Sequence, residues 1–245
     1  MRVGVVAVAL TLAFGSPALA QSPLVAELER TATRYHEDPT SLDALRDRLA
    51  RAVASDARVD HLVALARVCF LYGDARAATA EEKLAAFAQG RQAASRAVEA
   101  EPRNAAAHFW YATNTARWGQ TKGVLRSLFL LPDVRRGIET VLELDPTFTA
   151  VYSLAGYVDY EVPGLLGGDL ARAERMFRKG LEQDPRFTGM RVGLAKTLIK
   201  RGRAPEARRE LETVLDERSP SNPADWAVKD APEARRLLDS LRSTS

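Results

Sequence analysis

The stretch Gly164–Asp169, which reads GLLGGD, is the part of the sequence most suggestive of chemistry. A glycine-rich turn that opens onto a helix can bind phosphate, because its backbone N–H groups converge on the anion. The phosphate loop of nucleotide-binding proteins, however, follows a strand and continues with Lys and then Ser or Thr. Here Gly168 is followed by Asp169 in a helical context. We therefore predict that the glycines form a turn and that Asp169 is the N-cap of the next helix.

The histidines and the single cysteine form no catalytic or metal-binding pattern. His36, His61 and His108 occur singly, without the H-x-x-x-H spacing that places two metal ligands on one helix face. Cys69 lies in an apolar run and has no second cysteine to pair with, so we expect it in the core. The sequence thus predicts a protein without catalytic residues, metal or cofactor. An enzyme with an unrecognised site is a third hypothesis behind the two given below.

Composition and charge indicate an ordinary globular chain. The protein has 245 residues, of which 46% are hydrophobic and 27% are charged. The formal net charge is +3, and basic and acidic residues are interleaved along the whole sequence. Because nucleic-acid binding requires a concentrated basic surface, we expect no nucleic-acid partner.

The first twenty residues have the pattern of a secretory signal peptide. Arg2 precedes a short apolar run, and the stretch ends in Ala18-Leu19-Ala20, so cleavage is expected before Gln21. The run is shorter than the roughly 20 apolar residues of a membrane span. No cysteine lies near the cleavage site, so a lipid anchor is not indicated. We expect export to the periplasm, with residues 21–245 forming a single domain.

Three segments of the chain end alike, which indicates an internal repeat. They are AASRAVEAEPRN (Ala93–Asn104), RRGIETVLELDPTF (Arg135–Phe148) and AERMFRKGLEQDPRF (Ala173–Phe187). Apolar residues recur at helical spacing, and no alternating strand pattern is found beyond Pro39. The pattern resembles the tetratricopeptide repeat, a 34-residue helix–turn–helix unit, and Leu194, Ala195 and Leu198 match its first helix.

This resemblance implies an all-α, right-handed helical-repeat solenoid. Each unit cannot bury its apolar face alone, so the units must stack. A degenerate unit is expected before the clear ones, around HLVALARVCFLYGD and Glu81–Ala100. The clearest units cover residues 105–148, 149–187 and 188–221, and residues 222–245 form a C-terminal capping segment.

The first two clear units are longer than the standard repeat, and the extra residues fall between their two helices. The insertions are Gly119–Asp133 and the region around Gly164–Asp169, and both are apolar. Turns between the helices of such units project from one edge of the stack, so both insertions should lie on the same edge. Two alternatives stay open: the insertions plug the core, or they form a binding lip. The candidate lip residues are Leu128, Phe129, Leu130, Leu165 and Leu166.

The first helices of the units are rich in aromatic residues. In this repeat class those helices line a concave groove, which would suit a peptide or an amphipathic small molecule. The alternative is that the aromatic side chains pack between helices. The candidate groove residues are Phe109, Thr113, Arg117, Tyr157, Tyr160 and Lys196.

The two insertions together with the groove resemble a narrower family. HFWYATNTARWGQTKGVLRSLFLLPDVRRGIETVLELDPTF and YEVPGLLGGDLARAERMFRKGLEQDPRF are similar to the periplasmic T component of TRAP transporters, and distantly similar to eukaryotic regulators of microtubule dynamics. The resemblance implies a non-enzymatic accessory protein that works with a TRAP-type periplasmic substrate-binding protein and offers a hydrophobic channel to a ligand. The alternative is a protein–protein scaffold of the cell envelope without a ligand site. Self-association is left open.

Overall fold

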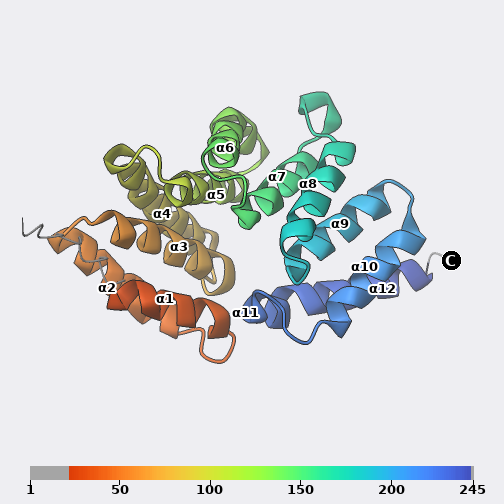
Figure 1. Ribbon diagram of the computed structural model, residues 1–245, viewed down its shortest axis with the longest axis horizontal. Coiled ribbons are helices and arrows are strands. Elements are labelled where there is room, and N and C mark those ends of the chain that lie inside the picture. The colour runs from red at the N-terminus through yellow and green to blue at the C-terminus, as the bar shows by residue number, and fades with distance from the viewer. Residues whose placement is uncertain (1–21, 244–245) are drawn as a thin grey trace, which may run out of the picture.

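The computed structural model describes residues 22–243, and within that range all regular elements are helices (Figure 1). The predicted all-α class with tetratricopeptide-like repeats is confirmed. The predicted signal peptide, residues 1–20, lies outside the described residues. None of the helices between residues 22 and 243 combines the length and the apolar character needed to cross a membrane.

Four helices form the N-terminal part, including two in a region to which the sequence analysis assigned no repeat. They enclose a core in which Cys69 is fully buried, as predicted, and burial raises the pKa of its thiol to about 12. The fourth helix begins with a capping box, in which Thr79 and Glu82 each accept a hydrogen bond from the other's backbone N–H. The helices are α1 (Pro23–Arg34), α2 (Ser41–Ser55), α3 (Val59–Ala75) and α4 (Ala80–Ala100).

Three helix pairs follow, and their first helices begin at Ala105, Thr149 and Thr188. The D-P-x-F motif between pairs is a turn in which an aspartate accepts a backbone N–H two residues later: Asp145 from Thr147, and Asp184 from Arg186. The pairs share one core with the C-terminal helix. They are α5 (Ala105–Lys122) with α6 (Val124–Leu144), α7 (Thr149–Glu161) with α8 (Leu170–Gln183), and α9 (Thr188–Lys200) with α10 (Ala204–Asp216).

The first insertion differs from the expected long turn. α5 ends at Lys122 and α6 begins at Val124, so the extra residues lengthen both helices and Gly123 alone joins them. Gly123 has φ +110°, a conformation that favours glycine. α6 also continues through Pro132, although proline removes one helical hydrogen bond. Gly119–Asp133 is therefore a helical hairpin tip rather than a loop.

The second insertion is a turn, as predicted. Residues Gly164–Leu166 form one turn of 3-10 helix (η1), and Gly167 follows with φ +90°. Asp169 is the N-cap of α8, because its carboxylate accepts hydrogen bonds from the N–H groups of Ala171 and Arg172 at 2.8 and 3.0 Å. These bonds lower the pKa of Asp169. The phosphate-loop alternative has no support in this geometry.

The C-terminal segment does more than cap the last repeat. Its helix α12 packs on α10 and shares that core. The stretch before it turns back across the molecule, so that α11 lies beside α1 (Figure 1). Ala224 is buried in the N-terminal core, while Trp226 Nε1 donates to the carbonyl of Val214 at 2.8 Å. The elements are α11 (Pro223–Asp225), a π-helical turn η2 (Trp226–Asp230) and α12 (Ala231–Ser243).

Candidate functional site

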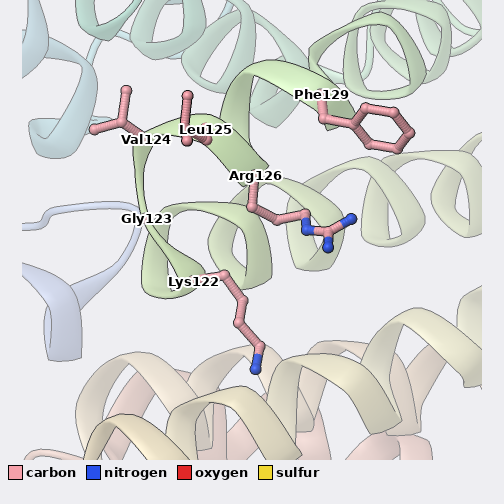
Figure 2. A pocket seen from close by; sticks show the side chains of 6 residues that line it. All are labelled: Lys122, Gly123, Val124, Leu125, Arg126 and Phe129. Carbon is pink, nitrogen blue, oxygen red and sulfur yellow. The ribbon is translucent and has the colours of Figure 1, made fainter.

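The two insertions carry most of the exposed large hydrophobic side chains of residues 22–243. The exposed fractions are 72% for Val124, 86% for Leu125, 74% for Phe129, 101% for Leu165 and 48% for Leu166. We call these five residues the apolar edge. Figure 2 shows the first three around the Gly123 turn, beside Lys122 and Arg126, where they border an open hollow of about 510 Å³.

The two insertions are held together by Arg135 of α6. Its Nη2 donates to the carbonyl of Gly167 at 2.5 Å, so the second insertion is attached to the helix that carries the first. The apolar edge therefore consists of two exposed apolar groups, one on each insertion, and the second is linked to α6 through Arg135.

A buried carboxylate of α7 helps to hold the second insertion in place. Asp159 is 5% exposed and accepts hydrogen bonds from Arg172 Nε and Nη2 at 2.5 Å each. The carbonyl of Asp159 accepts the backbone N–H of Asp169 at 3.1 Å, and Arg172 also donates to the carbonyl of Gly167. The fully exposed Leu165 is therefore carried on a turn whose backbone is tied to α7 and α8. Such preorganisation lowers the ordering cost of binding.

The charge beside the first insertion is basic. Arg126 lies over the rings of Trp118 and Phe129, at 5.9 and 5.6 Å from their centroids, and Lys122 lies 5.6 Å from the Trp118 centroid. Neither cation forms an ion pair with a residue in the described part of the chain. The apolar edge thus combines aliphatic and aromatic surface with two cations.

The structure answers the question of core plug or binding lip residue by residue. Leu130 is 6% exposed and packs near Gly119, so it fills the hairpin. Leu128 is half-buried. Phe129, Leu165 and Leu166 point outward. The first insertion therefore contains both a core residue, Leu130, and an exposed residue, Phe129.

The predicted groove residues of α5 do not line an open groove: two of them are buried and the third is ion-paired. Phe109 is buried and stacks against Trp110 and Phe148, with ring centroids 4.8 and 4.9 Å apart. Thr113 is also buried. Arg117 pairs with Asp74 of α3 and donates to Gln120 at 3.1 Å. Phe109 thus belongs to the core shared with α6 and α7, while Arg117 connects α5 to α3.

The predicted groove residues of α7 and α9 are engaged by neighbouring elements. The hydroxyl of Tyr157 donates to the carbonyl of Gly189 at 3.0 Å, and burial raises its pKa. Lys196 forms an ion pair with Glu233 of α12 at 2.9 Å. Tyr160 is half-buried and has the Lys200 ammonium 3.6 Å from its ring centroid. The C-terminal segment therefore covers part of the surface expected to be an open groove.

A polar network that the sequence analysis missed joins the two ends of the described chain. The hydroxyl of Tyr35 donates to Asp225 at 2.5 Å, and Lys229 binds Asp225 at 2.8 Å and Asp74 at 2.5 Å. Burial by itself would raise the pKa of Asp74, but Lys229 and Arg117 outweigh it and lower that pKa. Asp225 and Lys229 are four residues apart, but their partners Tyr35 and Asp74 lie more than 150 residues away, so no local spacing marks them.

Two of the histidines of residues 22–243 have structural surroundings in the fold. No group of three or more His, Cys, Asp or Glu side chains in residues 22–243 is arranged to hold a metal ion. The His61 ring forms a hydrogen bond with Ser22 at 2.7 Å, and the His108 ring bonds to the carbonyl of Pro102 at 2.9 Å. Both histidines thus have local structural partners.

The stacked helix pairs show that this is a helical-repeat protein of the tetratricopeptide type. A tetratricopeptide repeat family matches residues 165–229. A second family, described as regulator of microtubule dynamics protein 1-3, matches residues 24–166, more than half of the chain. The chain belongs to this family. No curated protein matches the chain.

A solved structure shows the same fold. TTC0263, a thermophilic tetratricopeptide-repeat protein from Thermus thermophilus, is 18% identical with a TM-score of 0.61, over 87% of this chain and 98% of that one. MamA residues 41-end from Desulfovibrio magneticus RS-1 is 13% identical with a TM-score of 0.49, over 80% and 96% of the two chains. At these identities the likeness concerns the fold alone.

Proposed function

We propose that this protein is a non-enzymatic scaffold that binds a protein partner through its apolar edge. One observation carries the proposal: five of the six exposed large hydrophobic side chains of residues 22–243 lie on two short insertions, and Arg135 ties the second insertion to α6. Exposed hydrophobic residues that occur singly are normal in soluble proteins, whereas clusters of them mark interaction sites. The rigid backbone beneath the patch supports binding rather than incidental exposure.

The partner we propose is a periplasmic substrate-binding protein of a TRAP-type transporter. The SLFLLPD and GLLGGD segments, which carry the resemblance to the T component of those transporters, contain Phe129, Leu165 and Leu166 of the apolar edge. The signal-peptide pattern of residues 1–20 supports a periplasmic encounter. A hydrophobic small-molecule ligand has less support, because the hollow beside Gly123 is open and the C-terminal segment covers part of the groove. We therefore propose binding of the TRAP-type partner without a hydrophobic small-molecule ligand.

Binding of the purified substrate-binding protein tests the proposal by calorimetry. A Phe129→Asp/Leu165→Asp variant should lose at least tenfold in affinity, because charged side chains cannot be buried against an apolar partner. The matched control is Ala54→Asp/Gln92→Asp, which adds the same charge at exposed positions of α2 and α4 and should bind normally.

A photo-crosslinking side chain separates the scaffold function from the choice of partner. Placed at position 129 or 165 in cells, it should give discrete protein adducts that position 54 does not give. Adducts with a protein other than a substrate-binding protein would reject the TRAP role and keep the scaffold. Absence of protein adducts at both positions would reject docking at the apolar edge.

A further inference from the structure

Residues Asn222–Asp230, which we call the closing segment, lie where a bound peptide would lie on a curved repeat protein. Such proteins use their concave surface for partners. Here the surface is covered by the chain's own residues, which connect α10 to α12 and reach α1 and α3 on the way. The segment therefore has the position of a ligand.

The contacts of the closing segment with the N-terminal helices are mostly charge-assisted. Asp225 accepts the Tyr35 hydroxyl at 2.5 Å, and Lys229 reaches Asp74, which Arg117 also binds. Ala224 is the small apolar anchor buried among these helices. Interactions of this kind are specific, and a second molecule with the same groups can compete for them.

The contacts with the C-terminal repeats combine hydrogen bonds with the packing of Trp226 against the repeat core. Asp230 accepts a hydrogen bond from the hydroxyl of Thr188 at 2.7 Å, and Ser221, just before the segment, donates to Asp184 at 2.7 Å. Trp226 is half-buried, and Val228 is 46% exposed. Large fully buried side chains, which anchor the repeats themselves, are missing from the closing segment within the described chain.

The closed arrangement also contains features that weaken it. Asp230 is 9% exposed, and among the described residues it forms no ion pair. A buried carboxylate with one hydroxyl donor is expensive to keep ionised. Residues Trp226–Asp230 are π-helical, a wide turn that is rare and occurs often at functional sites. Both features favour a segment that can detach while the repeats stay folded.

We propose that the closing segment is an intramolecular ligand of the concave face, and that an acidic helical segment of a partner protein binds there by displacing it. This surface is separate from the apolar edge. The partner's carboxylates would accept the hydrogen bonds of Tyr35 and Thr188 in place of Asp225 and Asp230, and its cation would replace Lys229 beside Asp74. The apparent affinity of such a partner is reduced by the small fraction of open molecules.

The test uses a labelled synthetic peptide with the sequence of residues 219–233 as the probe. In an Asp225→Ala/Lys229→Ala variant of the full chain the closing segment loses its contacts with Tyr35 and Asp74, while the groove residues are intact. The peptide should bind this variant at least tenfold more tightly than the wild-type chain by fluorescence anisotropy. A peptide with the same two alanines is the matched control and should lose that gain. Equal binding to the variant and the wild type, with unchanged helical circular dichroism, would overturn the proposal.

Hydrogen exchange on the wild-type chain gives a second test that does not depend on a variant's folding. If the segment detaches on its own, the amides of residues 224–230 should exchange at least tenfold faster than those of α9. Equal protection of the two stretches would mean that the segment opens only when the whole protein unfolds, and the proposal would then be rejected.

Discussion

The apolar edge and the concave face belong to the same repeats but differ in whether their side chains are exposed or covered by the chain itself. At the edge, Asp159 and Arg135 hold the backbone of the second insertion, while the large hydrophobic side chains of both insertions are exposed. On the concave face, polar side chains such as Lys196 and Asp74 have partners, and these come from the C-terminal segment. The edge is therefore always available, whereas access to the concave face depends on the position of residues 222–230.

The largest effect should come from the turn that carries Leu165. A Cβ added at Gly168 would lie 1.7 Å from the carbonyl oxygen of Val162, a backbone atom that no side-chain rotation can move. We expect Gly168→Ala to lower the free energy of unfolding by about 3–5 kcal/mol, because the turn must rebuild. Urea denaturation measures this change.

Gly164→Ala is the matched control within the same turn. A Cβ at Gly164 meets no atom within 4 Å. This variant should unfold within about 0.5 kcal/mol of the wild type. If both variants unfold like the wild type, the turn is not fixed to α7, and the contrast between a rigid edge and a displaceable segment fails.

The second effect concerns Asp230 and depends on pH. Burial raises the pKa of Asp230 from 3.8 to about 6, despite the hydroxyl of Thr188 and the nearby Lys229 and Lys196; Asp225 acts in the same direction as burial. Because the folded state holds this proton more tightly than the unfolded state, stability falls as pH rises from about 4 to 6. The contribution of Asp230 to the free energy of unfolding should then be about 1–3 kcal/mol lower at pH 7 than at pH 4.

Asp230→Asn isolates that contribution. Asparagine can still accept the Thr188 hydrogen bond but carries no charge, so the variant should be the more stable protein at pH 7 by about 1–3 kcal/mol. The difference should shrink toward pH 4, where the wild-type carboxyl is protonated in the folded state. Thermal unfolding at pH 4, 5, 6 and 7 provides the measurement. A constant difference across this range would show that Asp230 titrates normally and that closure carries no penalty.

The sequence was sufficient for features set by local chemistry. The burial of Cys69 and the N-cap role of Asp169 each follow from residues within a few positions of one another. The hairpin around Gly123 was not foreseen, since the residues in excess of the standard repeat were assigned to the turn between the helices. In the structure they extend both helices, and Leu130 is buried in the hairpin.

The closing of the concave face could not be predicted in the same way. It depends on partners such as Tyr35 with Asp225, which only the assembled curvature of the repeats brings together. The groove positions counted from the repeat pattern assumed an empty concave face. The C-terminal segment that returns across it supplies the partner of Lys196 without altering the repeat pattern itself.

The smallest effect on stability, and the sharpest test of the edge, is expected from neighbouring residues of one helix. Phe129 is 74% exposed, and Leu130 is 6% exposed. Phe129→Ala should change the free energy of unfolding by less than about 0.5 kcal/mol, since it removes few packing contacts and alanine favours a helix. Leu130→Ala should cost about 2–4 kcal/mol, because it leaves a cavity in the hairpin. Denaturation curves and partner-binding measurements on both variants separate a binding role from a core-packing role. Phe129→Ala should weaken binding without lowering the stability of the fold. If the two variants are destabilised equally, Phe129 belongs to the core and the apolar edge loses its central residue.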